Sequence, residues 1–173
     1  MCLLRPGGSR SRSSRPHGPA PGLARALATE PEFVFLDEPT SALDLSVRGQ
    51  IVNLLLELQE KKQLAYLFVS HDLGVVRFLA HRVLVMYLGQ VVESAPTEEI
   101  FSRAAHPYTQ ALLAAAGLDG AAVQGELTEL GRPESGCRFA NRCPYVEARC
   151  REEEPPMFQI SESHQARCWL LED

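Results

Sequence analysis

The stretch FVFLDEPTSALD, residues 33–44, decides the fold. It opens with four consecutive apolar residues, Phe33 to Leu36, and the carboxylates of Asp37 and Glu38 follow directly. A continuous apolar run of this kind is typical of a parallel β-strand that is covered on both faces. In open α/β sheets, ligands collect at the carboxyl ends of such strands. The stretch therefore predicts a buried strand with an acidic site at its end.

The residues that follow predict an alternation of helices and strands. Apolar residues recur at helical spacing from Val47 to Leu58, and a second apolar strand is expected at Leu64 to Val69. A short helix should come after Ser70-His71-Asp72. The β-α-β order implies parallel strands, so we expect an α/β fold with a doubly wound sheet. Residues Val83 to Tyr87 and Val91 to Val92 predict an antiparallel hairpin appended to that sheet.

Composition divides the chain into four parts. The first is rich in Arg, Ser, Pro and Gly and is expected to be disordered, because it has too few apolar side chains to form a core. The second holds the predicted strands and helices. The third predicts helices that begin near Pro96 and Pro107, followed by a Gly-rich linker, and the fourth holds four cysteines. The parts are residues 1–22, 23–95, 96–136 and 137–173.

Charge and hydropathy limit the classes of function. The net charge of -5 and the acidic pI near 5.6 argue against a nucleic-acid-binding protein. The sequence contains no apolar run long enough to cross a membrane, and its first residues lack the pattern of a signal peptide. We therefore expect a cytoplasmic location, with membrane contact made through a partner protein. Cysteines in that compartment are kept reduced, which raises the question of metal or cluster binding.

The two carboxylates at the end of the first strand suggest phosphate chemistry. A hard cation such as Mg²⁺ prefers oxygen ligands, and a strand end fixes the position of a carboxylate, which suits Asp37. The adjacent Glu38 would then be placed to orient an attacking water and accept its proton. An ordinary acidic junction between strand and loop is the alternative interpretation of the same two residues.

Taken together, FVFLDEPTSALD and the later YLFVSHDL resemble the ATPase family of ABC transporters. The resemblance implies that ATP and Mg²⁺ are bound, with Asp37 as the Mg²⁺ ligand and Glu38 as the catalytic base. It also implies that Ser41 to Asp44, including both end residues, form the loop that contacts nucleotide and a second ATPase subunit. His71 would sense the γ-phosphate. Without the family context, a lone histidine before a helix is interpreted as a capping or surface residue.

Three further segments resemble the oligopeptide and dipeptide importer branch of that family. They are MYLGQVVESAPTEEIF from Met86, HPYTQALLAA from His106 and GCRFANRCPYVEARC from Gly136. The resemblance implies the C-terminal part of a P-loop-type ABC ATPase domain plus a small Cys-rich extension. It further implies an ATP-binding subunit, peripheral on the inner face of the cell membrane, that couples ATP hydrolysis to peptide import. Its partners would be membrane permease subunits and a second ATPase subunit, with peptide reaching the permease through a binding protein.

The sequence also departs from the family pattern. A phosphate loop needs Gly-x-x-x-x-Gly-Lys-Ser/Thr, yet the only lysines are Lys61 and Lys62. The glutamine loop and the LSGGQ signature are absent too, and Gly7-Gly8, flanked by Pro6 and Ser9, does not replace the signature. Whether these residues alone act as an enzyme is therefore open. The alternative is a truncated, non-catalytic remnant that retains only an iron-sulfur or metal-binding module.

Four cysteines near the C-terminus form a separate candidate site. Cys137, Cys143, Cys150 and Cys168 lack the tight spacing of common zinc ribbons. The family resemblance implies an iron-sulfur cluster here, and four cysteines suit a 4Fe-4S cluster. Unliganded thiols and zinc are the alternatives, and residues 137–173 could also act as an autonomous cluster-binding module. His164 is a possible zinc ligand, although we expect an ordinary polar residue at the surface. Cys2 is expected to be incidental.

Overall fold

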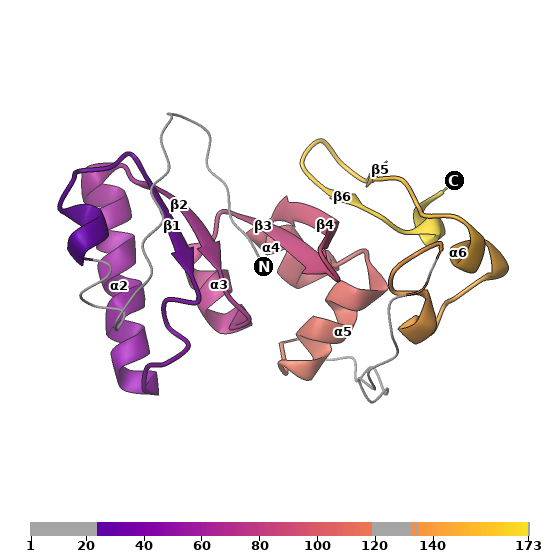
Figure 1. The fold of residues 1–173 in the computed structure, drawn as a ribbon, viewed down its shortest axis with the longest axis horizontal. Coiled ribbons are helices and arrows are strands. Elements are labelled where there is room, and N and C mark those ends of the chain that lie inside the picture. The colour runs from indigo at the N-terminus through magenta and orange to yellow at the C-terminus, as the bar shows by residue number, and fades with distance from the viewer. Residues whose placement is uncertain (1–23, 119–132, 134, 173) are drawn as a thin grey trace. The chain divides into compact units, whose positions relative to one another are not determined.

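The computed structural model describes residues 24–118, 133 and 135–172 (Figure 1). The contacts divide the chain into two compact units, Met1–Arg82 and Val83–Asp173. The predicted N-terminal tail, including Cys2 and Gly7-Gly8, lies outside the described residues. So does most of the predicted linker between residues 117 and 136.

The first unit contains a parallel pair of strands with a helix after each strand, and a short helical stretch at residues 24–27 precedes them. Strand β1 (Phe33–Asp37) pairs with β2 (Ala65–Val69), and α2 (Leu45–Lys62) and α3 (Leu73–Leu79) follow the two strands in turn. Figure 1 shows β1 and β2 side by side. The predicted β-α-β order and parallel pairing are confirmed. Helix α2 ends at the Lys61-Lys62 pair, where positive charge favours the helix C-terminus.

Only one face of β1 is covered within the described residues. Val34 and Leu36 are buried against a core that includes the fully buried Leu55 and Phe68, whereas the Phe35 side chain is 38% exposed. Successive strand residues point to opposite faces of a sheet, so Phe35 faces away from this core. The expectation that β1 is covered on both faces is therefore wrong for the residues described.

The second unit is built on a four-stranded sheet. Its strand order is β3 (Arg82–Tyr87), β4 (Gln90–Pro96), β6 (Gln165–Ala166) and β5 (Phe158–Gln159). Leu88 and Gly89 join β3 to β4 with positive φ angles of 45° and 77°, as a two-residue type I′ turn requires. The predicted hairpin is thus confirmed. It lies in this second sheet rather than in the parallel sheet, because β4 takes its other partner from the C-terminal segment.

Short helices complete the second unit. Helix α4 (Thr97–Arg103) follows Pro96, and α5 begins at Pro107, as the sequence predicts. No helix in the described part of the chain is long and apolar enough to span a bilayer. The helices of this unit are α4, α5 (Pro107–Ala115), the 3₁₀ turn η1 (Ala140–Arg142), α6 (Ala148–Glu152) and the 3₁₀ turn η2 (Trp169–Leu171).

Candidate functional site

The first candidate site lies at the carboxyl ends of β1 and β2. The strand register sets Asp37 opposite Val69, and the amide of Glu38 donates a hydrogen bond of 2.9 Å to the carbonyl oxygen of Val69. The segment Ser70-His71-Asp72 leaves β2 at the same edge. Two stretches that are about thirty residues apart in sequence therefore meet because the strands are parallel and in register.

Glu38 and His71 are in direct contact at this edge. Glu38 Oε1 accepts a hydrogen bond of 3.1 Å from the His71 backbone amide and lies 2.8 Å from His71 Nδ1. The second oxygen, Glu38 Oε2, is buried and has no hydrogen-bond partner among the described residues. A buried carboxylate oxygen without a partner is costly, so the geometry suits a further partner, either a water that donates a hydrogen bond or a cation. The structure thus brings the two predicted catalytic residues together.

Backbone strain at Glu38 shapes the loop that follows β1. Glu38 has a φ of 46°, in the left-handed region that non-glycine residues rarely occupy. Its carbonyl oxygen accepts hydrogen bonds from the Ser41 amide at 3.3 Å and the Ser41 hydroxyl at 2.9 Å.

Asp37 and Asp44 are both exposed, and Asp44 occupies the N-cap position of α2 without a side-chain cap. The roles of Asp37, Ser41 and Asp44 stay predictions.

An ion pair that the sequence analysis missed braces the same edge. Arg48 Nη1 lies 2.5 Å from Asp72 Oδ2, and Arg48 Nη2 donates to the Leu43 carbonyl oxygen at 3.4 Å. Partial burial raises the pKa of Asp72, but the Val75 amide and the Arg48 guanidinium outweigh this effect, so the pKa lies below its usual value. An aspartate directly before an apolar helix is an N-cap signal that could have pointed to Asp72.

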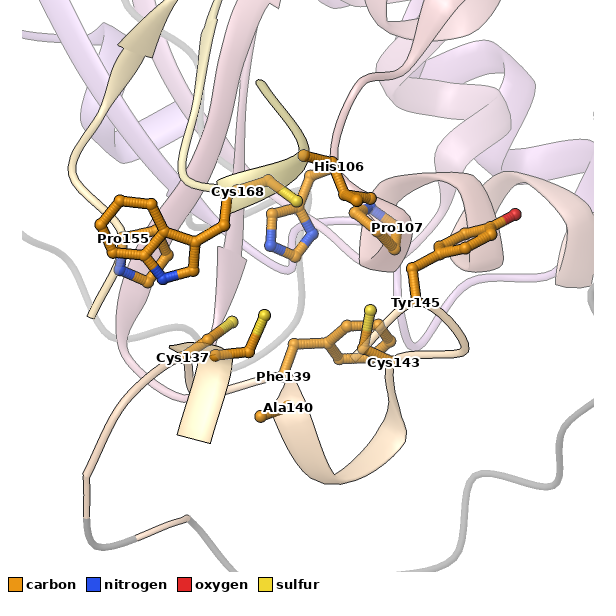
Figure 2. Close-up of a pocket in the computed structure, with 12 residues that line it drawn as sticks. His106, Pro107, Cys137, Phe139, Ala140, Cys143, Tyr145, Pro155 and Cys168 are labelled. Atoms are coloured by element: carbon orange, nitrogen blue, oxygen red, sulfur yellow. The ribbon is translucent and has the colours of Figure 1, made fainter. Parts of the chain in front are cut away.

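The four C-terminal cysteines line a second site, an apolar pocket in the second unit (Figure 2). The pocket is small and partly open to solvent. All four are free cysteines, and Cys168 is the most buried. Other lining residues include His106, Phe139 and Trp169. Sequence spacing did not predict this convergence, because the turns that fold residues 137–150 back on themselves have no short signature.

Close backbone packing brings two of the cysteine-bearing segments together. The amide of Cys137 donates a hydrogen bond of 2.8 Å to the carbonyl oxygen of Cys150. The preceding Gly136 has a φ of 75°, and a Cβ atom at this position would lie 2.4 Å from the same oxygen. Only glycine fits both the backbone angle and the close approach. Gly136 therefore determines the distance between two sides of the pocket.

The donor set of this pocket is sulfur. Burial raises the pKa of Cys137 and Cys143, and raises that of Cys168 to about 11, so the pocket by itself favours neutral thiols. A bound metal would have to displace those protons. No group of three or more His, Cys, Asp or Glu side chains within residues 24–118 and 135–172 is arranged to hold a metal ion.

His106 lines the pocket but is not available as a ligand. Its Nδ1 accepts a hydrogen bond of 3.0 Å from the Tyr108 amide, and its ring also hydrogen-bonds to the backbone of Arg167. Burial lowers the pKa of His106 to about 4, which leaves the ring neutral near pH 7. Both ring nitrogens are thus used in holding the fold together.

The expectation for His164 is wrong. Instead of lying at the surface, its side chain is only 1% exposed, and His164 Nε2 lies 2.7 Å from Oε1 of the fully buried Glu93. Glu93 is not among the candidate residues that the sequence indicates. A charged residue between the apolar Val92 and Ala95 in a strand is only a weak signal of a buried pair. Polar residues in strands usually face solvent, so the position by itself indicates an exposed side chain.

Comparison with known proteins identifies the family. Residues 92–150 match the family model for the C-terminal region of oligopeptide/dipeptide transporters. Over 154 residues, 85% of its length, the chain is 45% identical to a probable peptide ABC transporter ATP-binding protein, y4tS, of Sinorhizobium fredii. This chain belongs to the family of peptide ABC transporter ATP-binding proteins. The region that matches the family model includes three of the four pocket cysteines.

Two further relatives show the same pattern. The chain is 42% identical to the oligopeptide transport ATP-binding protein AppF of Bacillus subtilis over 86% of its own length and 48% of that protein. It is also 42% identical to the di/tripeptide transport ATP-binding protein DppF of Pseudomonas aeruginosa over 84% of its own length and 47% of that protein. The chain thus spans about half the length of the curated relatives it matches.

Proposed function

We propose that the chain forms the C-terminal part of a subunit that hydrolyses ATP to drive peptide import. The contact of 2.8 Å between Glu38 and His71 at the strand edge, with Glu38 Oε2 left without a partner among the described residues, carries this proposal. A carboxylate held at one oxygen and free at the other is suited to receive a proton from a water. Names of the relatives support the peptide class of transport.

Each residue at the edge has a separate role in this proposal. Asp37, exposed at the end of β1, would be a ligand of Mg²⁺, which neutralises phosphate charge when bound. Glu38 orients and deprotonates the attacking water. His71, whose side chain is 79% exposed beside Glu38, would sense the γ-phosphate. The loop from Ser41 to Asp44 contacts nucleotide and a second ATPase subunit.

The larger assembly follows from the same proposal. The subunit acts on the inner face of the cell membrane, bound to membrane permease subunits. Peptide reaches those permease subunits from a binding protein, so the ATPase never contacts the peptide. A phosphate loop would have to be supplied by another stretch of polypeptide, since no Gly-x-x-x-x-Gly-Lys-Ser/Thr occurs among these 173 residues.

A joined protein tests the proposed Mg²⁺ ligand. The chain would be fused to the N-terminal half of the Bacillus subtilis relative, and Mg²⁺-ATP binding and turnover would be measured. We expect Mg²⁺-dependent hydrolysis in the parent and weaker binding of Mg²⁺-ATP in Asp37→Asn, because the amide removes the charge that attracts the cation. Glu57→Gln, an exposed carboxylate on α2, is the matched control. Unchanged Mg²⁺-ATP affinity in Asp37→Asn would contradict the assignment.

A second proposal concerns the cysteine pocket. The convergence of Cys137, Cys143, Cys150 and Cys168 on one apolar pocket favours a bound 4Fe-4S cluster over isolated thiols. When bound, such a cluster would link the segments that carry the cysteines and could exchange electrons. The apolar walls would limit the access of water to it, and the four sulfur atoms would hold it.

Iron incorporation tests this second proposal. The 173-residue chain would be incubated without oxygen with ferrous iron, sulfide and a thiol reductant. We expect visible absorption and bound iron in the parent chain and loss of both in Cys168→Ala. Cys2→Ala, which removes the one cysteine outside the proposed ligand set, is the matched control. Failure of the parent chain to bind iron, or equal binding by Cys168→Ala, would argue against the cluster.

A further inference from the structure

Glu93 is the most completely buried carboxylate described in the second unit, with a side-chain exposure of 0%. It lies on β4, outside the pocket, and the proposed functions give it no role. Burying a carboxylate is costly unless hydrogen bonds and a charge partner compensate. Glu93 has two backbone amides and a histidine side chain as hydrogen-bond partners, and they come from two different parts of the chain.

One set of partners is the backbone between α4 and α5. Glu93 Oε1 accepts a hydrogen bond of 2.7 Å from the Ala105 amide, and Oε2 accepts one of 3.0 Å from the His106 amide. These bonds fix the turn from which α5 begins. His106 and the adjacent Pro107 line the cysteine pocket, where Figure 2 shows both side chains. The carboxylate thus sets the position of one wall.

The other partner is His164, in the turn between β5 and β6. His164 Nε2 lies 2.7 Å from Glu93 Oε1, and His164 Nδ1 lies 3.3 Å from Glu99 Oε2. Strand β6 then runs beside β4, with Ala166 opposite Glu93 and the Arg167 amide bonded to the Val92 carbonyl oxygen at 2.8 Å. The next residue is Cys168, which is buried and also lines the pocket.

One side chain therefore holds two chain segments that line the pocket. We propose that Glu93 is a positioning residue of the cysteine pocket: its carboxylate holds the turn at His106 directly and the segment of Cys168 through His164. The benefit to cluster binding rests on the cluster proposed above, whereas the positioning of Cys168 does not. A buried carboxylate with three hydrogen-bond donors tolerates little displacement of those donors. Glu93 therefore keeps the segment of Cys168 in place and its thiol enclosed.

Glu93→Gln tests this role in the 173-residue chain. The amide keeps the size of the side chain but replaces one accepting oxygen with a donor, so that one charge-assisted hydrogen bond is lost. Two quantities would be measured for each variant: the alkylation rate of each cysteine by mass spectrometry, and the iron bound after incubation with ferrous iron and sulfide. Glu98→Gln, on the exposed side of α4, is the matched control, and circular dichroism monitors folding.

We expect Glu93→Gln to raise the alkylation rate of Cys168 about tenfold and to lower iron retention, with parental circular dichroism. His164→Gln should raise the alkylation rate of Cys168 more than that of Cys143, because it loosens only the segment that contains β6. The same variant tests the proposal if Glu93→Gln does not fold. Parental alkylation rates in both variants would overturn the proposal. If the parent binds no iron, the cluster proposal fails, and the alkylation rates still decide the role of Glu93.

Discussion

The strand edge at Glu38 and the cysteine pocket at Cys168 differ in how much of each site the described residues enclose. At the strand edge, His71 is largely exposed and Glu38 Oε2 lacks a partner among the described residues. At the pocket, Cys168 is buried and all four thiols face walls from the same unit. In the functions proposed above, the first site needs groups from elsewhere to act on a phosphate, whereas the four thiols of the second would hold a cluster by themselves. We therefore expect substitutions and assays to affect one site without affecting the other.

The largest expected difference concerns the 173-residue chain by itself. We expect it to bind iron and sulfide but to show no significant ATP turnover, because positioning and charge stabilisation by a phosphate loop dominate phosphoryl transfer. Nucleotide titration, Mg²⁺-dependent phosphate release and visible absorption on one preparation would measure both sides of the comparison. Micromolar ATP affinity with Mg²⁺-dependent turnover would show that the strand edge is more complete than we infer.

Gly136→Ala should damage the pocket and spare the strand edge. The added Cβ would lie 2.4 Å from the Cys150 carbonyl oxygen at a φ of 75°, so we expect destabilisation of the second unit by at least about 2 kcal/mol. Denaturant unfolding and iron binding would measure this loss.

Gly49→Ala is the matched control for that substitution. Gly49 lies within α2, and nothing comes within 4 Å of an added Cβ. The exchange should stabilise that helix by roughly 0.5–1 kcal/mol, because alanine loses less backbone freedom than glycine. Similar iron loss in both variants would show that Gly136 has no special place in the pocket.

The smallest expected effect is the contribution of the Arg48–Asp72 pair to stability in acid. Because the folded-state pKa of Asp72 is lowered, its contribution is present above the unfolded pKa near 3.8 and is lost as pH falls through the folded pKa. Partial exposure limits the pair to about 1 kcal/mol or less. Thermal unfolding from pH 7 to pH 3 should show a weaker acid dependence in Arg48→Met than in the parent. Equal slopes would mean that the pair contributes nothing to stability.

Local patterns predicted much of the fold, and long-range pairing limited the rest. Neighbouring residues are enough to predict four features of the fold. These are the apolar runs before Asp37 and Ser70, the helix end at Lys61-Lys62 and the turn at Gly89. The placement of β4 beside β6 joins residues about seventy positions apart, and no local pattern encodes that pairing. For this reason the hairpin was expected in the wrong sheet.

The same distinction applies to the sites. Family resemblance named Glu38 and His71, and the structure places them in contact. The buried pair of Glu93 and His164 could not be predicted, because each residue looks like an ordinary exposed polar group until the two strands that carry them are known to be neighbours. The convergence of the four cysteines was implied by resemblance alone, since their spacing is irregular.

Turnover by Glu38→Gln in the joined ATPase tests the central claim most directly. Gln keeps the size of the side chain but cannot accept a proton from water, so the loss should fall on the transition state. We predict turnover lowered by on the order of 100 to 10,000-fold with ATP affinity close to that of the parent. Hydrolysis of ATP at the parental rate would contradict the assignment of Glu38 as the base and leave His71 as the next candidate.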